Sequence, residues 1–331
     1  MGKPLLAFAL VAFAGALALA GKPSGGGGTG GGTVYYSYQG GTWSMNADGT
    51  GKTALPAGVG GEPSIALHGG QRWFAQVRDI PGETYPDGGK RKEIFAVRAD
   101  GALVRQLTTG PDLQVLDPVR WKPGDAGISW VARRWSGGAV VEGGIYAADV
   151  LFDAAGNVTG LMAQPAAPAV VAGLDSSLTP DVKGHDWSPD GSQVAHERWN
   201  SSNSYEIRIS DLSGSSRRLV AGGSQPRWSP DGSKIVYTNV GICTISPDGS
   251  GAKTVIKNTS GLHYHTPVWS PSASHLACGS TVYTSSGEGG ALVRPIPSDI
   301  RRATAAGGSL TKLTSDLQQG PRYRKVLLGW R

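Results

Sequence analysis

Short apolar runs alternate with clusters of Gly, Pro, Asp and Ser along most of the chain. One pattern recurs: residues 187–191 and 228–232 both read Trp-Ser-Pro-Asp-Gly, and residues 269–271 repeat its first three positions. The tryptophans of these copies are 41 residues apart in both intervals. The first two copies are followed by short apolar runs, at residues 193–195 and 234–237. Because Pro, Asp and Gly favour turns, the pattern predicts pairs of short strands joined by a tight turn.

Weaker copies extend this pattern over the whole chain. They are Pro-Val-Arg-Trp-Lys-Pro at residues 118–123, Pro-Ser-Ile at 63–65 and Pro-Arg-Tyr at 321–323, which brings the number of copies to six. A second element alternates with the first. It is an apolar run that ends in a turn, with Asp-Gly in its clearest copies. It also occurs six times, near residues 43–49, 95–101, 145–156, 207–211, 243–249 and 306–307.

Each unit therefore contains about four strands: the Pro-x-Trp strand, its hairpin partner, the strand before Asp-Gly, and an outer strand such as residues 105–108. Four strands in about 40 residues are typical of a β-propeller. The chain starts in the middle of a unit, at residues 34–36, and residues 320–323 would supply the missing first strand. The sequence thus predicts an all-β, six-bladed β-propeller of four-stranded blades over residues 33–331. Pairing of the N- and C-terminal strands would close the ring and remove two exposed sheet edges.

The Trp-Ser-Pro-Asp-Gly strand followed by an Asp-Gly strand resembles the TolB-like, WD40-like propeller repeat. This resemblance covers about residues 33–331. It is specific for the fold and unspecific for function. TolB proteins carry an α/β domain ahead of the propeller, and the related peptidases carry a separate hydrolase domain. We expect neither in this chain, so the resemblance implies a propeller scaffold without peptidase activity.

The N-terminus has the features of an export signal. Lys3 provides a positive charge, and residues 5–20 form an uncharged apolar run that ends in Ala-Leu-Ala. These features predict a secretory signal peptide at residues 1–20. An uncleaved anchor is the alternative, although the run is short for a membrane span. Residues 21–32 are mostly Gly and predict a flexible tether. We therefore expect a periplasmic or secreted protein without a membrane span after cleavage.

The composition fits a turn-rich β protein and narrows the function classes. The chain has 51 Gly and 21 Pro, and only 17% of its residues are charged. The net charge of +6 comes from scattered Lys and Arg, so we expect no nucleic-acid binding, which normally needs a basic stripe with interleaved aromatics. The Gly-x-Ser-x-Gly motif of serine hydrolases does not occur. Export would permit a disulfide between Cys243 and Cys278, and two free, buried cysteines are the alternative.

Three histidines form a candidate metal site. His263 and His265 lie two residues apart in a predicted strand, so both face the same side of it. His185 lies in a similar position two blades earlier. If these strands line the central channel, the three imidazoles would approach one divalent metal ion. The arrangement resembles the oligogalacturonate lyases, related propellers with a His-rich manganese site, which would imply a metal-dependent polysaccharide lyase. Histidines that only form hydrogen bonds at blade tips, with no cofactor, are the alternative.

A second candidate site is cationic. The residue before the motif aromatic is Arg120, Arg227 and Arg322 in three blades, and Asp186 in a fourth. If these side chains reach the channel, they form a mixed, mostly positive ring that suits an anion or an acidic peptide. Salt bridges between blades are the alternative use of these charges.

Insertions lengthen three blades beyond the 41-residue period, at residues 78–92, 133–183 and 279–312. Loops on a rigid scaffold are where binding specificity usually resides. Together these features favour a non-enzymatic, monomeric, exported propeller. It would bind a protein or another cell-envelope component through its blade loops and channel mouth. The metal-dependent lyase, based on the histidine cluster, is the alternative function.

Overall fold

The computed structural model describes residues 31–38, 41–56, 58–60, 63–110, 112–162, 184–199, 202, 204–212, 218–284, 294–315 and 326–331. The predicted signal peptide (1–20) and nearly all of the predicted tether (21–32) lie outside these ranges, so both stay predictions. The described residues form β-strands and one 3-10 turn, Pro123–Asp125, and contain no α-helix. Accordingly, this part of the chain has no helix of the length and hydrophobicity needed to span a bilayer.

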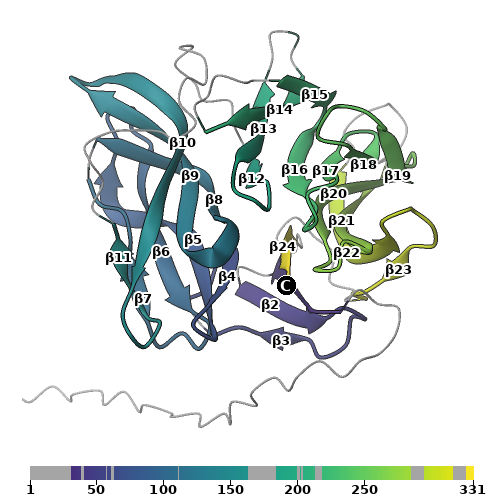
Figure 1. Cartoon of the computed structure of the whole chain (residues 1–331), viewed down its shortest axis with the longest axis horizontal. Helices are drawn as coiled ribbons and strands as arrows, with labels where there is room; N and C mark the ends of the chain where they lie inside the picture. Colours follow the sequence, from purple (N-terminus) through teal and green to yellow (C-terminus); the bar gives the residue numbers. More distant parts are fainter. Residues whose placement is uncertain are drawn as a thin grey trace, which may run out of the picture.

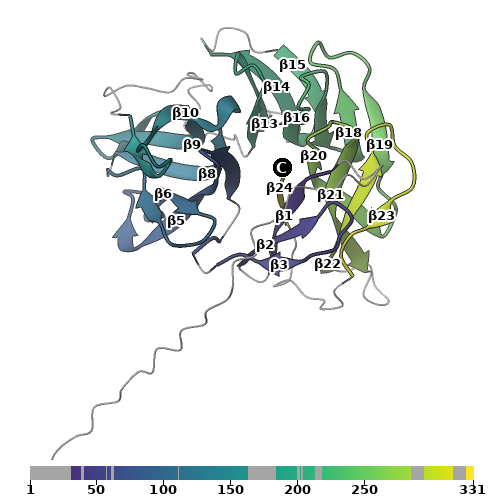
Figure 2. The same ribbon diagram turned by 60° about the horizontal axis from the view of Figure 1, so that its bottom comes forward.

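The strands form six four-stranded antiparallel sheets, here called blades 1 to 6, which surround a central axis (Figures 1 and 2). In each blade the strand given first lies nearest the axis. Blade 1 consists of β24 (Val326–Trp330), β1 (Thr33–Tyr38), β2 (Gly41–Asn46) and β3 (Thr53–Ala54). Blade 2 consists of β4 (Ser64–His68), β5 (Gln71–Thr84), β6 (Lys90–Arg98) and β7 (Val104–Gln106). Blade 3 consists of β8 (Leu113–Trp121), β9 (Gly127–Ser136), β10 (Ala139–Phe152) and β11 (Val158–Leu161).

The second half of the ring repeats this order. Blade 4 consists of β12 (His185–Trp187), β13 (Gln193–Trp199), β14 (Tyr205–Asp211) and β15 (Arg218–Gly222). Blade 5 consists of β16 (Ser224–Trp228), β17 (Ile235–Thr238), β18 (Gly241–Ile245) and β19 (Lys253–Lys257). Blade 6 consists of β20 (Leu262–Trp269), β21 (His275–Thr284), β22 (Arg294–Thr304) and β23 (Thr311–Lys312). The predicted all-β, six-bladed architecture is therefore confirmed.

The two ends of the chain close the ring inside blade 1. β24 pairs antiparallel with β1, and the register places Val34 opposite Trp330. The backbone N–H of Arg331 also donates to the carbonyl of Thr33 at 2.9 Å. Closure by the terminal strands is thus confirmed, but the closing strand differs from the predicted one. It is β24, and the predicted segment 320–323 lies outside the described residues.

Six hydrophobic clusters hold the blades together, one at each interface between neighbours. In five of them a tryptophan at the end of an innermost strand is buried against the preceding blade, and in the sixth an isoleucine takes this place. These residues are Trp121, Trp187, Trp228, Trp269, Trp330 and Ile65. The cluster between blades 3 and 4 has the fewest buried members: Val131, Ile145, Trp187 and Val194. The repeated motif therefore supplies the contact that joins each blade to the next.

The aspartates of the repeated turns cap backbone N–H groups, as their sequence positions predict. Asp190 accepts from the backbone N–H of Ser192 at 3.0 Å, and Asp231 accepts from that of Ser233 at the same distance. In both turns the motif serine also accepts from the backbone N–H five residues later, at 2.9 Å. These bonds fix the hairpin between the two inner strands of blades 4 and 5.

The insertions lengthen hairpins. In blade 2, β5 spans 14 residues, and in blade 3, β10 also spans 14, so both hairpins extend well beyond those of blades 4 and 5. In blade 6, β21 and β22 span 10 and 11 residues. Segments 163–183 and 285–293 of these insertions lie outside the described residues. In their described parts, the predicted recognition elements of blades 2 and 3 are therefore mainly paired strands.

Both cysteines are free and buried. Cys243 packs in the cluster between blades 4 and 5, whereas Cys278 packs in the cluster between blades 5 and 6. Of the two alternatives left open by the sequence, the structure shows the free, buried cysteines. Burial raises the pKa of the Cys278 thiol to about 12, so this group stays protonated and unreactive.

The turn at residues 270–273 predicts a simple stability test. Ala273 has φ of 56° at a position where Gly191 and Gly232 have φ of 72° and 74°. This left-handed conformation strains every residue that carries a Cβ atom, so Ala273→Gly should raise the free energy of unfolding by about 0.5 kcal/mol. The reverse change, Gly232→Ala, should lower it by about 1 kcal/mol. Its new Cβ would make only ordinary contact, 3.6 Å from Pro189.

Urea unfolding of both variants beside the parent protein measures these differences. A loss of stability in Ala273→Gly would mean that the packing of its methyl group against the cluster between blades 5 and 6 outweighs the backbone strain.

Candidate functional site

The ends of the six innermost strands surround a cavity of about 620 Å³ at one mouth of the central channel. Every blade contributes to its wall. The basic and acidic side chains among the described lining residues are Arg120, Lys122, Arg227, Arg331, Asp125 and Asp186. Four positive groups therefore face two negative ones in a cavity that is large enough for a peptide side chain or a small anion.

Three of the four residues predicted for the cationic ring lie together here. Arg120 on β8, Asp186 on β12 and Arg227 on β16 all line the cavity. Arg322, the fourth, lies outside the described residues. Arg331 also lines the mouth, although the sequence pattern did not predict it there. The signal that could have located these charges is the position directly after the motif aromatic, where Lys122 and Arg331 stand in place of the serine of the three Trp-Ser-Pro copies.

Asp186 forms a hydrogen bond to the next blade and also places a carboxyl group in the channel mouth. Its Oδ2 accepts a hydrogen bond from the backbone N–H of Trp228 in the next blade at 2.8 Å. Ser64 makes the same kind of bond between blades 2 and 3, because its Oγ accepts from the backbone N–H of Trp121 at 2.9 Å. Burial raises the pKa of Asp186, although the charges of Arg227, Arg120 and Arg331 act in the opposite direction.

The cationic side chains are held against the wall of the channel. The guanidinium of Arg227 donates to the carbonyl of His185 at 3.3 Å, and that of Arg120 donates to the carbonyl of Val119 at 2.9 Å. Each of these bonds to a carbonyl orients a planar guanidinium that carries five N–H groups. The arginines are thus positioned before any ligand arrives.

Asp125 connects the rim of the mouth across three blades. This residue of blade 3 accepts from the backbone N–H of Leu67 in blade 2 at 3.0 Å. It also lies 3.7 Å from the guanidinium of Arg331, which follows β24 of blade 1. Here a charged pair links blades, although neither residue belongs to the predicted cationic ring. Such an exposed pair contributes little to stability and leaves Arg331 half-exposed.

His185 is fully buried beside the channel, where it forms part of the contact between blades 3 and 4. Its Nε2 lies 2.8 Å from Ser129 Oγ, and this hydroxyl also accepts from Trp187 Nε1 at 2.8 Å. Since the indole N–H can only donate, this geometry favours a serine that donates to Nε2 and a neutral imidazole. Burial and the nearby charges of Arg120 and Arg227 lower the pKa of His185 well below its usual value.

The other two histidines of the predicted metal site lie on β20 of blade 6. His263 is exposed, whereas His265 is partly buried, with Nε2 at 2.9 Å from Thr281 Oγ1 and Nδ1 at 3.2 Å from Thr266 Oγ1. Across the described residues, which include all three histidines, no three His, Cys, Asp or Glu side chains are grouped so that they could hold a metal ion. The structure does not bring His185, His263 and His265 together as a ligand set.

The buried His185 predicts how stability depends on pH. Its pKa is lower in the folded protein than the value of about 6.5 expected in the unfolded chain, so the unfolded state binds more protons as the pH falls below about 6.5. The free energy of unfolding should then decrease by up to about 1.4 kcal/mol per pH unit on account of this group. In His185→Gln this contribution is absent, so its stability should depend less on pH between about 6.5 and 5.

Urea unfolding at a series of pH values compares the two proteins. Above about pH 7 their curves should run parallel, because the imidazole is then neutral in both states. Equal slopes for the two proteins between pH 6.5 and 5 would contradict the assignment of a buried, neutral His185.

Comparisons with known proteins support the fold. The sequence matches no family model and no curated protein. In structure, the chain is similar to TolB from Acinetobacter baumannii, with a TM-score of 0.53 and 14% identity over 90% of this chain and 67% of that one. It is also similar to a protein assigned as TolB from Agrobacterium tumefaciens, with a TM-score of 0.50 and 15% identity over 86% of this chain and 89% of that one.

Hydrazine synthase from Kuenenia stuttgartiensis is as similar as the first of these, with a TM-score of 0.53 and 13% identity over 91% of this chain and 47% of that one. A single fold is therefore shared by proteins with unrelated names, and it does not assign a function to this chain. The comparisons show that the chain is a six-bladed β-propeller with the fold of the TolB-like proteins.

Proposed function

We propose that this protein is an exported binding propeller without enzymatic activity, and that its channel mouth holds an acidic segment of a protein partner in the cell envelope. The observation that carries the proposal is the placement of Arg120, Arg227 and Arg331 around one cavity. Guanidinium groups on a low-dielectric wall attract carboxylates more strongly than the same groups on an open surface.

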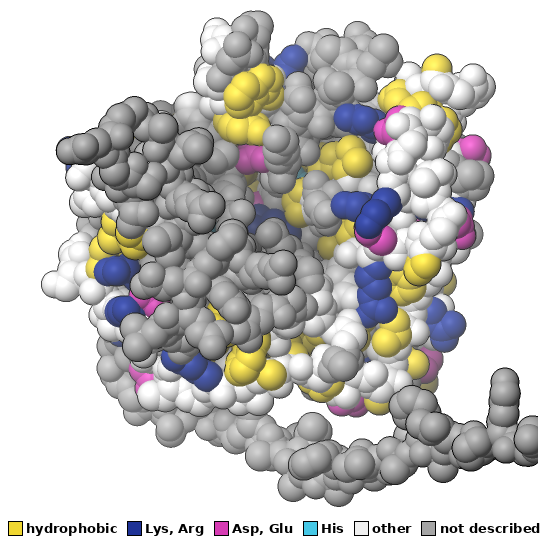
Figure 3. Space-filling view, turned by 180° about the vertical axis from the view of Figure 1, so that it is seen from behind, with side chains coloured by type: hydrophobic (Ala, Val, Ile, Leu, Met, Phe, Trp, Pro, Cys, Tyr) yellow, Lys and Arg dark blue, Asp and Glu magenta, His cyan; other side chains and the backbone are white. Residues whose placement is uncertain are grey.

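One side of the molecule shows how charges are arranged away from the mouth. Figure 3 shows Lys and Arg side chains along the side of the molecule where blades 2 and 3 lie, with Asp and Glu interspersed among them. Mixed charges of this kind largely screen one another in water. At the mouth, in contrast, the four basic side chains outnumber the two acidic ones and line one partly open cavity.

The arginine side chains that a peptide would contact in the channel mouth are already held in position. Arg227 and Arg120 are already bonded to carbonyls of β12 and β8, so little side-chain entropy remains to be lost on binding. Asp186 opposes an anionic ligand, because it is the acidic residue among the three arginines. Its bond to Trp228 keeps it there for structural reasons, and it tunes the affinity of the site.

The binding proposal predicts opposite effects of two substitutions. The probe is a fluorescent peptide of alternating Glu and Gly, with a Lys and Gly peptide as its counterpart. Arg227→Gln removes a charge-assisted hydrogen bond and should weaken binding of the acidic peptide about tenfold. Asp186→Asn keeps an acceptor for Trp228 and removes a negative charge, so it should bind the acidic peptide several-fold more tightly. Fluorescence anisotropy at low and high salt measures both.

Lys257→Gln is the matched control, because it removes one positive charge from the exposed outer strand of the same blade as Arg227. It should leave the affinity unchanged. Equal losses in Lys257→Gln and Arg227→Gln would contradict a specific site at the mouth. Binding of an acidic oligosaccharide such as oligogalacturonate, without binding of the acidic peptide, would contradict the protein-partner form of the proposal.

The export part of the proposal rests on the apolar run at residues 5–20 and predicts a defined mature end. Cleavage after Ala20 should make Gly21 the first residue of the protein recovered from the periplasm or the medium. Intact-mass analysis of the purified protein identifies this end. Recovery of the full chain from the membrane fraction would favour the uncleaved anchor instead.

A further inference from the structure

A second cavity, of about 360 Å³, lies where the long hairpins of blades 2 and 3 meet. The lining residues come from the tip of the β5–β6 hairpin, the tip of the β9–β10 hairpin and the start of β8. They are Thr84, Tyr85, Pro86, Asp112, Trp135, Ser136, Gly137 and Gly138. Asp112 precedes β8, whereas the channel mouth lies at the end of that strand. A strand of nine residues spans about 30 Å, so the two cavities lie at opposite ends of the propeller.

The indole ring of Trp135 is fixed at the edge of this pocket. Its Nε1 donates to Gln114 Oε1 at 3.0 Å, and Gln114 Nε2 in turn donates to Asp87 Oδ2 at 3.2 Å. The backbone N–H of Trp135 donates to the carbonyl of Asp112 at 2.7 Å. The chain of bonds links the hairpins of both blades, so the pocket presents an aromatic surface that is oriented before a ligand binds.

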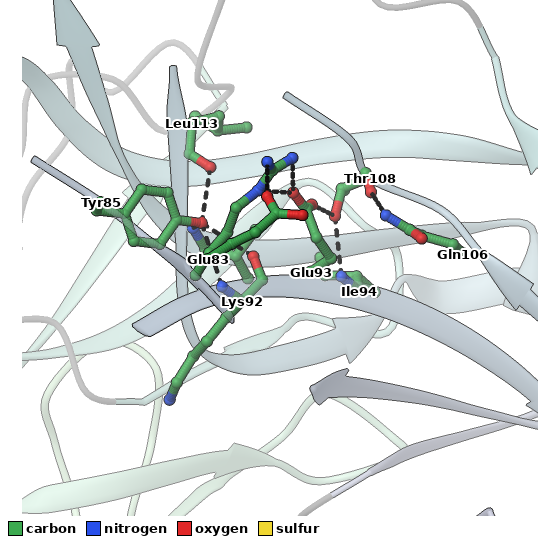
Figure 4. Close-up of polar contacts among 10 residues, drawn as sticks. Glu83, Tyr85, Lys92, Glu93, Ile94, Gln106, Thr108 and Leu113 are labelled. Carbon is green, nitrogen blue, oxygen red and sulfur yellow. Dashed lines mark hydrogen bonds and ion pairs between the residues drawn. The ribbon is translucent and has the colours of Figure 1, made fainter. Parts of the chain in front are cut away.

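Tyr85 forms the floor of the pocket and is held even more firmly. Its hydroxyl donates to the carbonyl of Lys92 at 2.9 Å and lies 3.3 Å from the carbonyl of Leu113, so it bridges the two blades (Figure 4). The same hydroxyl accepts from the backbone N–H of Val115 at 3.3 Å. Only 3% of the Tyr85 surface is exposed, which makes the residue part of the scaffold rather than a mobile side chain.

A buried carboxylate stiffens the base of the blade 2 hairpin. Glu93 is paired with Arg91, with Nε and a terminal nitrogen at 3.0 and 2.9 Å from Oε1. It also accepts from Thr108 Oγ1 at 2.6 Å, and Thr108 in turn accepts from the backbone N–H of Ile94 (Figure 4). Because its charge is paired and hydrogen-bonded, this network fixes β6 against the segment that follows β7 and with it the hairpin that carries Tyr85.

The rim of the pocket is polar and open. Thr84 and Ser136 place hydroxyl groups there, and Asp112 contributes an exposed carboxylate that makes no hydrogen bond or ion pair within the described part of the chain. Gly137 and Gly138 form the turn on the other side, and a Cβ atom at either position would have no neighbour within 4 Å. The turn therefore leaves room for a ring-sized ligand to approach the aromatic surface.

We propose that this pocket binds one pyranose ring of a neutral carbohydrate. A sugar ring has a face of C–H groups that packs on an indole, whose face is negative and attracts polarised C–H. Its hydroxyl groups match a carboxylate acceptor and two hydroxyls on the rim, which supply orientation and specificity. The carboxylate of Asp112 repels an acidic sugar. The pocket thus prefers a neutral ligand, whereas the channel mouth prefers an anionic one, and the two sites are independent.

Saturation-transfer NMR of the whole protein with methyl glucoside, methyl galactoside and methyl mannoside tests this proposal. For a ligand of about thirteen non-hydrogen atoms, a dissociation constant of about 1 mM is expected for at least one sugar. Trp135→Ala should weaken binding at least about tenfold, whereas Trp135→Phe keeps an aromatic face and should retain it. Asp112→Asn should weaken binding of the methyl glycoside and strengthen binding of glucuronate, because the repelling charge is removed.

Arg227→Gln, at the opposite end of the propeller, serves as the control for location and should leave sugar binding unchanged. The proposal is overturned if none of the three sugars binds at about 10 mM, or if binding survives Trp135→Ala in a folded variant. Binding of choline at this pocket in place of the sugars would also overturn it, since a cation would then be the ligand that Asp112 and Trp135 select.

Discussion

The burial of one large side chain from each innermost strand against the preceding blade is the contact on which the propeller depends. A single repeat unit of this kind cannot bury its hydrophobic faces alone and needs its neighbours to cover them. Trp121, Trp187, Trp228, Trp269 and Trp330, together with Ile65, cover these faces in turn around the ring. The hydrophobic gain is shared between neighbours, so each blade is stabilised by the presence of the two beside it.

This contact also places the channel mouth. The residue before each motif aromatic must lie at the axis, because the aromatic beside it points away into the interface between blades. Arg120, Asp186 and Arg227 therefore converge for reasons of backbone geometry, and their types contribute to the charge of the cavity together with those of the other charged lining residues. The scaffold fixes where a ligand group would be held, and substitution at six positions is enough to change what is held there.

Most of the fold could be predicted from the sequence repeat. Six copies of each element, and Asp-Gly turns with their capping aspartates, follow directly from the spacing of tryptophan, proline and glycine. The closing strand was harder to locate, because Pro-Arg-Tyr at 321–323 and Leu-Gly-Trp at 328–330 both fit a degenerate motif, and only pairing with β1 decides between them. The residues of the channel mouth could be predicted from the sequence where they occupy a fixed position in the motif, as Arg120 and Arg227 do. The pocket between the hairpins could not be predicted from the sequence, because it depends on how far β5 and β10 extend.

The closure of blade 1 has a consequence for the order of folding. β1 and β24 lie nearly 300 residues apart in the sequence, yet they are neighbours in one sheet. Until residues 326–330 arrive, the inner edge of β1 is unpaired and the interface between blades 6 and 1 lacks Trp330. Blades 2 to 5 contain only contacts of short sequence separation and form early, whereas the final step waits for a slow, long-range encounter. Pairing of β24 with β1 is thus the event that converts an open, edge-exposed intermediate into a closed ring.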